Sequence, residues 1–145
     1  MNEGTKKCHC FSSFFITKLL FEKGDYKFKN VKRWLKKIRA LEYENLIFPV
    51  NHGNIHWFLM FVSLKNKLLK YYDSLSGCVD QSDINNYVKG VVQCLVDLCK
   101  KHRCEGVPNE WLTSDPIVFR AECYQQPNSK LVSIAHVINV SLICL

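Results

Sequence analysis

Residues 46–74 read LIFPVNHGNIHWFLMFVSLKNKLLKYYDS, and the centre of the fold is predicted from this segment. It contains three short runs rich in β-branched and aromatic residues, at 46–50, 55–64 and 68–72, with turn-forming residues between them. Runs of this length and composition are typical of β-strands that follow one another through short turns. The sequence therefore predicts three adjacent strands in the middle of the chain.

Apolar residues at helical spacing lie on both sides of this segment. The sequence predicts helices at 11–21, 30–38 and 83–103, and a further short strand at 116–119. The last helix has the most regular apolar pattern, and Asp80 or Ser82 is available to cap its start. The order of helices, strands, helix and strand predicts an α+β domain.

Composition limits the possible classes of protein. A chain of 145 residues with 48% hydrophobic residues can bury one core, so we expect a single domain over residues 1–145. The chain has eight cysteines but no secretory signal, so reduced thiols are expected. Its longest apolar run, 132–145, contains polar residues and is shorter than the roughly 20 residues of a spanning helix, so we expect no membrane span.

The net charge of +7 is concentrated in the first forty residues. Such a charge favours an acidic partner, although a solvated basic surface would look the same in sequence. An acidic protein is favoured over nucleic acid because no repeated aromatic platform accompanies the lysines. The basic residues in this part are Lys6, Lys7, Lys18, Lys23, Lys27, Lys29, Lys32, Arg33, Lys36, Lys37 and Arg39.

His56 and Asp73 are candidates for a catalytic pair. His56 lies at the start of one predicted strand and Asp73 at the end of the next, so an antiparallel hairpin would bring both to one edge of the sheet. A general-base imidazole is commonly held in one tautomer by such a carboxylate. Asp73 could instead be an aspartate that stabilises a turn before Ser74. Trp57, the residue after His56, could instead be an aromatic residue of the core.

Four motifs around these residues occur in a characteristic order. They are Phe48-Pro49-Val50-Asn51, His56-Trp57, Tyr71-Tyr72-Asp73-Ser74-Leu75 and Gln125-Gln126-Pro127-Asn128-Ser129. In order and spacing they resemble the Ulp-type family of sentrin/SUMO-specific cysteine proteases. Together with likenesses near Phe11, Arg33 and Trp111, the resemblance covers residues 8–129. It implies a papain-like α+β domain, with a central mixed sheet flanked by helices.

The resemblance also implies roles for individual residues. His56 matches the general base, Asp73 the acid that orients it, and Gln126 the amide that donates a hydrogen bond to the oxyanion. Trp57 matches the tryptophan that covers the tunnel for the diglycine tail of the modifier. No cofactor or metal is implied.

The same resemblance places two residues on the face that meets the modifier. Phe14 matches an aromatic contact residue, and its alternative interpretation is a residue of the helix core. Arg33 matches a basic contact residue, and its alternative interpretation is a solvated surface residue. The implied partner is SUMO or a SUMO-conjugated protein, bound by a monomer. The family is largely nuclear, and the basic cluster at 32–37 is compatible with that location.

The family pattern is broken where the nucleophile is expected. In the family an Asp-Cys-Gly follows, with its cysteine six residues beyond the second glutamine, and Val132 occupies that place here. Residues 130–145 resemble nothing in the family, and no Trp-Leu-Asn-Asp-like segment precedes Lys6, so we expect a domain that lacks the nucleophile helix and is incomplete at both ends. The chain is therefore expected to be inactive as a protease. A catalytically dead SUMO-binding module and a non-functional fragment are the alternatives.

Other cysteines do not restore the pattern. Cys78, Cys123 and Cys144 would each need a coincidental position beside His56 to act as nucleophile. The groups at 8–10 and 94–104 lack the paired Cys-x-x-Cys spacing of a zinc site. We therefore interpret these thiols as buried helical residues and predict no metal.

Overall fold

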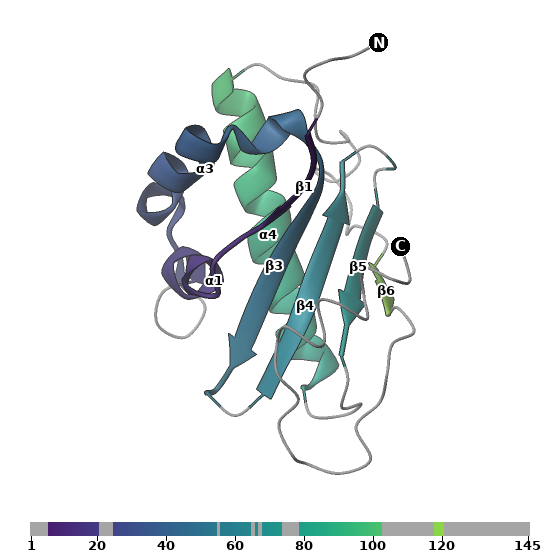
Figure 1. Cartoon of the computed structure of the whole chain (residues 1–145). Helices are drawn as coiled ribbons and strands as arrows, with labels where there is room; N and C mark the ends of the chain where they lie inside the picture. Colours follow the sequence, from purple (N-terminus) through teal and green to yellow (C-terminus); the bar gives the residue numbers. More distant parts are fainter. Residues whose placement is uncertain are drawn as a thin grey trace.

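The computed structural model describes residues 6–20, 25–54, 56–64, 66, 68–73, 79–102 and 118–120. Its centre is a five-stranded sheet in the order β1-β3-β4-β5-β6, formed by Lys6–Cys10, Tyr43–His52, His56–Ser63, Leu68–Tyr72 and Val118–Arg120 respectively. β3 pairs with β4 and β4 with β5 in antiparallel fashion, whereas the outer pairs, β1 with β3 and β5 with β6, are parallel. Figure 1 shows this mixed sheet, with one long helix running behind its strands and the shorter helices on the side of β1.

The three predicted central strands are confirmed. They are β3 (Tyr43–His52), β4 (His56–Ser63) and β5 (Leu68–Tyr72). β3 begins three residues before the predicted run because Asn45 pairs with both Cys8 of β1 and Ser63 of β4. Strand pairing thus extends β3 through polar residues that the apolar pattern does not mark.

The two edge strands differ in how well the sequence marks them. β6 (Val118–Arg120) overlaps the strand predicted at 116–119. β1 (Lys6–Cys10) was not predicted, because its polar sequence lacks the β-branched and aromatic residues that indicate strands. It is nevertheless continued by Phe11, whose backbone N–H donates to the carbonyl of Ile47 at 2.8 Å.

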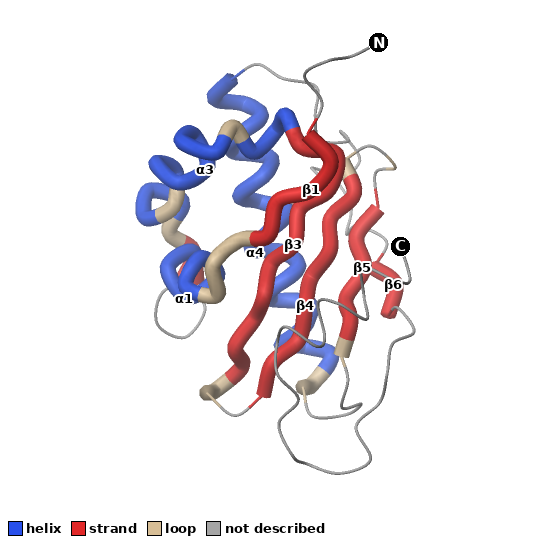
Figure 2. The backbone as a smooth tube through the Cα atoms, viewed as in Figure 1, coloured by secondary structure: helices blue, strands red, loops and turns tan. Residues whose placement is uncertain are grey.

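Three helices pack against one face of the sheet (Figure 2). They are α1 (Phe14–Leu19), α3 (Lys32–Ile38) and α4 (Gln81–His102), and all three confirm predicted helices, though α1 and α3 are shorter than predicted. α3 ends at Ile38, and the next residue, Arg39, adopts a left-handed conformation with φ of 56°. α4 begins directly after Asp80, whose backbone carbonyl accepts the N–H groups of Asp83 and Ile84.

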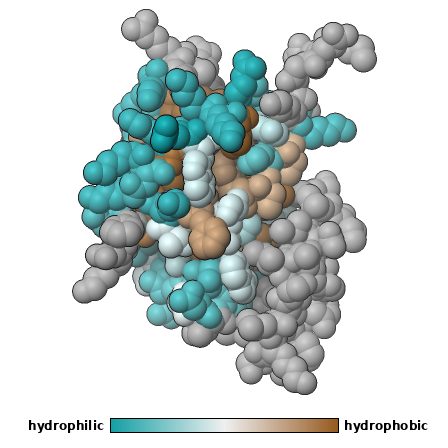
Figure 3. Space-filling view, turned by 60° about the vertical axis from the view of Figure 1, so that its left-hand side comes forward, coloured by the Kyte–Doolittle hydropathy of each residue, from teal (hydrophilic) through white to brown (hydrophobic). Residues whose placement is uncertain are grey.

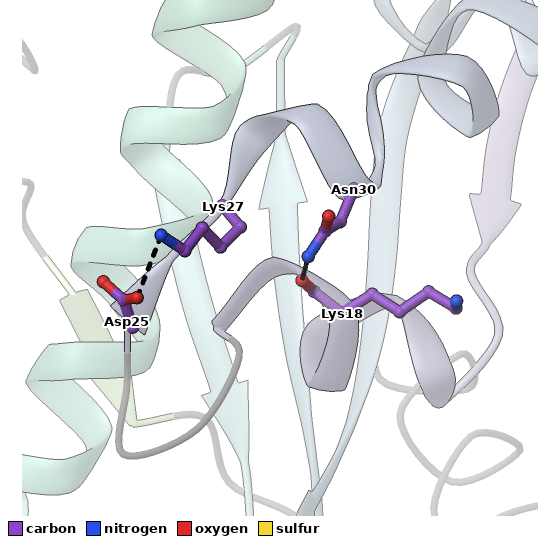
Figure 4. Close-up of polar contacts among 4 residues, drawn as sticks. All are labelled: Lys18, Asp25, Lys27 and Asn30. Carbon is purple, nitrogen blue, oxygen red and sulfur yellow. Dashed lines mark hydrogen bonds and ion pairs between the residues drawn. The ribbon is translucent and has the colours of Figure 1, made fainter.

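Short elements connect α1 to the sheet. They are β2 (Asp25–Tyr26), the 3₁₀ helix η1 (Phe28–Asn30) and the 3₁₀ helix η2 (Ala40–Glu42). Figure 4 shows how η1 is joined to α1: the side-chain amide of Asn30 donates to the backbone carbonyl of Lys18 at 3.0 Å. In the same region Lys27 and Asp25 form an exposed ion pair at 3.0 Å.

The hydrophobic core lies between the helices and one face of the sheet. Alternate strand residues point into it, as the two-residue period of a strand requires. These strand residues are Leu46, Phe48, Val50, Phe58, Met60, Val62, Leu69 and Tyr71. On the other face Ile47, Leu59, Phe61 and Tyr72 are also buried. The central strands are therefore buried on both faces, which explains why their sequences read as nearly continuous apolar runs.

Among the described helices, none is both long enough and apolar enough to cross a membrane.

Candidate active site

Strand pairing brings His56 and Asp73 together. His56 is the first residue of β4 and Asp73 directly follows the last residue of β5. Since these strands are antiparallel, with Leu59 opposite Tyr72, the start of one meets the end of the other at the same edge of the sheet. His56 Nε2 lies 2.7 Å from Asp73 Oδ1.

The surroundings of this pair favour a fixed, directional contact. Both side chains are buried, with exposed fractions of 6% for His56 and 4% for Asp73. A hydrogen bond to an ionised carboxylate is shorter and stronger than a neutral one, and removal from water strengthens it further. With the Nε2 proton donated to Asp73, Nδ1 is the ring nitrogen that can accept a proton. The geometry is that of an oriented general base.

Trp57 follows His56 in β4 and is partly buried. Its Cα pairs across the sheet with that of Asn51. The side-chain oxygen of Asn51 is buried and, among the described residues, has no hydrogen-bond partner.

Phe14 belongs to α1 and Arg33 to α3. These helices lie on the left of Figure 1, the side that comes forward in Figure 3, where much of the surface is hydrophilic. Phe14 on α1 is 66% exposed, so the alternative of a core residue is wrong. Arg33 on α3 is also exposed. Near them, the Lys18 ammonium lies 5.6 Å from the centre of the Trp34 ring. The two predicted contact residues are thus accessible, on neighbouring helices in the chain.

The remaining candidate residues lie outside the described part of the chain. These are Gln126, Val132 and the alternative thiols Cys78, Cys123 and Cys144. Their roles stay predictions, as do those of His56 and Asp73.

The interpretation of the other cysteines needs one correction. Cys94 is buried in α4, and burial, followed by the nearby Asp97 carboxylate, raises the pKa of its thiol. Cys8 and Cys10 are not buried helical thiols: they are exposed on strand β1. Within the described ranges, no three His, Cys, Asp or Glu side chains gather in a way that could hold a metal ion.

A surface hollow of about 570 Å³ lies elsewhere, between the end of α3, η2 and α4. Its lining includes Leu35, Lys37, Arg39 and Leu98 but neither His56 nor Asp73. We therefore do not assign it to the active site.

One cluster near His56 has no counterpart in the sequence predictions. His52 Nδ1 lies 3.0 Å from the Tyr87 hydroxyl, and His52 Nε2 lies 3.8 Å from Asp83 Oδ2. Asp83 and Tyr87 are four residues apart, a spacing that places them on one face of a helix. Nothing in the sequence pattern relates that face to His52.

A mixed sheet that holds a buried imidazole–carboxylate pair at one edge has the architecture of a papain-like hydrolase domain. The sequence matches the Ulp1 protease family, C-terminal catalytic domain, over residues 1–130. The chain belongs to this family. It is 40% identical over 73 residues to human sentrin-specific protease 2, a match that covers 50% of this chain and 12% of the human protein. It is 39% identical over 87 residues to the ubiquitin-like-specific protease ESD4 of Arabidopsis thaliana, covering 57% of this chain and 17% of the plant protein.

Solved structures share the fold. The C-terminal Ulp1 protease domain in complex with Smt3, the yeast ortholog of SUMO, has 26% identity and a TM-score of 0.66, over 94% of this chain and 54% of that domain. The SUMO protease Ulp1 with its catalytic cysteine oxidised to a sulfonic acid has 26% identity and a TM-score of 0.69, over 94% of this chain and 57% of that one. The chain therefore has the Ulp1-like α+β protease fold and spans about half the length of these solved chains.

Proposed function

We propose that this chain carries the modifier-binding face and the histidine–aspartate base of a SUMO-specific cysteine protease, and that by itself it binds SUMO without cleaving it. The observation that carries the first part is the buried 2.7 Å contact between His56 and Asp73. Membership of the Ulp1 family supports it. The second part rests on Val132, which stands where the resemblance expects the nucleophile.

The proposed chemistry of the intact site assigns a task to each group. A cysteine thiolate attacks the carbonyl of the modifier's terminal glycine, His56 protonates the leaving amine, and Gln126 donates a hydrogen bond to the oxyanion. Valine at 132 has no nucleophilic atom. Loss of the nucleophile from a protease triad costs roughly a million-fold in turnover, so we expect no measurable hydrolysis.

Turnover is tested by incubating the purified chain with a SUMO precursor and with a SUMO–lysine conjugate. We expect neither to be cleaved, and we expect no covalent adduct with a SUMO probe that carries a thiol-reactive group at its C-terminus. The matched control is His56→Ala. Cleavage by the wild-type chain that disappears in this variant would show that another group acts as nucleophile and that the inactivity proposal is wrong.

Binding depends on a different set of residues and is tested separately. The proposed contacts are Phe14, Arg33 and Trp57, of which the first two are exposed. An exposed aromatic side chain that anchors a partner commonly contributes more than about 1 kcal/mol to binding. We therefore expect Phe14→Ala and Arg33→Glu each to weaken SUMO binding, measured by calorimetry, by roughly tenfold or more.

Lys89→Glu is the matched control for charge, because Lys89 is an exposed lysine on α4, outside the basic N-terminal third of the chain. It makes the same change in net charge as Arg33→Glu and is expected to bind SUMO nearly as wild type. If the wild-type chain shows no binding, the alternative of a non-functional fragment is favoured. If all basic-to-acidic changes weaken binding equally, the contact is non-specific charge attraction.

A further inference from the structure

The two histidines of the β3–β4 hairpin face each other at its turn. His52 and His56 are the last paired residues of the two strands. In the turn between them, Gly53 and Asn54 both have positive φ values, 61° and 60°. The end of a hairpin is where strand pairing opens most readily, unless other contacts hold it. The proposed base therefore occupies the position in β4 that is least secured by the strand ladder itself.

Helix α4 supplies contacts at this point. The Tyr87 hydroxyl lies 3.0 Å from His52 Nδ1, and the two rings meet edge to face with centroids 5.9 Å apart. The Tyr87 ring also meets Phe58 of β4 edge to face at 5.6 Å. One side chain of α4 thus touches both strands of the hairpin, two residues away from His56 on the β4 side.

The arrangement of protons in this cluster follows from its neighbours. Asp83 Oδ2 faces Nε2 of His52 at 3.8 Å, which favours a proton on that nitrogen. Nδ1 of the neutral ring is then an acceptor, and the Tyr87 hydroxyl donates to it. Burial, followed by the Asp83 carboxylate, raises the pKa of Tyr87, so the phenol keeps its proton at neutral pH.

We propose that His52, Tyr87 and Asp83 form a latch that ties the turn of the β3–β4 hairpin to the first turns of α4 and thereby positions His56 beside Asp73. His52 and Tyr87 are positioning residues, since they act on the base through the hairpin and do not take part in the reaction. The importance of the latch for catalysis rests on the proposed role of His56. The effect of the latch on the order of the hairpin is independent of that proposed role.

The test uses Tyr87→Phe, which removes the hydroxyl and keeps the ring against Phe58. We expect the amide protons of residues 50–52 and 56–58 to exchange roughly two- to tenfold faster relative to those of the core, which is the change that loss of one net hydrogen bond produces. We also expect the imidazole ¹⁵N resonances of His56 to shift, because its contact with Asp73 loosens.

Tyr26→Phe is the matched control. It also removes a phenol hydroxyl that is bonded to α4, in this case to Asp97 near the other end of the helix at 2.5 Å. It is expected to lower overall stability but to leave hairpin exchange and the His56 resonances unchanged. Equal effects of the two tyrosine variants on the hairpin would show a general loss of stability and would overturn the latch.

A second pair of variants addresses His52 itself. His52→Ala removes the acceptor for the Tyr87 hydroxyl, whereas His52→Asn retains a side-chain acceptor at a similar position. The asparagine variant is expected to restore part of the wild-type hairpin protection and His56 signals, and the alanine variant none. Wild-type behaviour of His52→Ala would disprove the proposal. Because none of these measurements needs SUMO or a nucleophile, the latch can be confirmed even if the proposed function fails.

Discussion

At the scale of single residues, the contact between His56 and Asp73 carries a cost as well as a benefit. Each group loses hydration on burial, and the 2.7 Å hydrogen bond offsets that loss only while both partners are present. Removing one partner leaves the other buried without its main contact. The pair is therefore expected to matter for stability as well as for the proposed proton transfer.

We predict that Asp73→Ala lowers the free energy of unfolding by about 1–3 kcal/mol, the cost of leaving a buried hydrogen-bonding group without its partner. Urea denaturation followed by circular dichroism measures the change. Asp25→Ala is the control, because the carboxylate of Asp25 also contacts a basic side chain, Lys27 at 3.0 Å, but on the surface, with 63% of the Asp25 side chain exposed. Exposed ion pairs contribute about 0–1 kcal/mol. Equal losses in the two variants would contradict the buried character of the contact between His56 and Asp73.

At the scale of secondary-structure elements, the position of α1 depends on a close approach to α4. A Cβ atom built on Gly90 of α4 would lie 2.7 Å from Cδ2 of Leu20, the residue that follows α1. Alanine at this position should gain about 1 kcal/mol from its higher helix propensity, but it would collide with the leucine. The absence of a side chain at residue 90 thus allows the two segments to meet.

A double-mutant cycle tests this packing. We predict that Gly90→Ala is no more stable than wild type, because the steric conflict cancels the gain in propensity. In a Leu20→Ala background the conflict is gone, and the same substitution is expected to stabilise the chain by about 1 kcal/mol. Thermal unfolding of the four proteins gives the coupling energy. A glycine-to-alanine effect that is the same in both backgrounds would refute the proposed contact.

The elements also show what the sequence could and could not predict. The central strands were predicted because most of their residues are apolar, a consequence of burial on both faces of the sheet. β1 was missed because its own composition does not indicate a strand. Lys6–Cys10 is a strand because it pairs in parallel with β3. Helix ends were imprecise because no side-chain cap fixes the start of α1 or α3.

The candidate site was predictable to the extent that it follows from strand order. The proximity of His56 and Asp73 required only that two consecutive strands run antiparallel. The cluster around His52 depends on how α4 rotates about its axis when it packs on the sheet, and its partner Tyr87 is 35 residues away. Local periodicity does not determine that rotation, so the latch could be found only in the structure.

At the scale of the whole molecule, several weakly acidic side chains are held in their neutral forms. Burial is the first cause of the raised pKa of Cys94, Tyr26 and Tyr87, and a neighbouring aspartate adds to it in each case. All three contact or belong to α4, the helix that covers the core. Each group ionises more readily in the unfolded chain than in the folded one.

Stability should therefore decline in alkaline solution. In the unfolded chain the pKa is about 9 for a thiol and 10 for a phenol. Below these values the folded and unfolded chains both keep these protons, so the groups do not make the free energy of unfolding depend on pH. Above those values the unfolded chain loses protons that the folded chain retains, so the free energy of unfolding falls as pH rises. The buried thiol of Cys94 alone is expected to contribute a slope of about 1.4 kcal/mol per pH unit above pH 9.

Urea unfolding between pH 7 and pH 11 in the presence of a reducing agent measures this slope, and Cys94→Ala is predicted to reduce it by the contribution of one proton. Val96→Ala is the control, because Val96 is a buried residue of the same helix whose truncation lowers stability at every pH without removing a titrating group. The wild-type and Val96→Ala curves should run parallel, with the Cys94→Ala curve flatter above pH 9. Parallel curves for all three proteins would mean that the thiol at 94 ionises equally well in both states, and that α4 does not seal this side of the core from water.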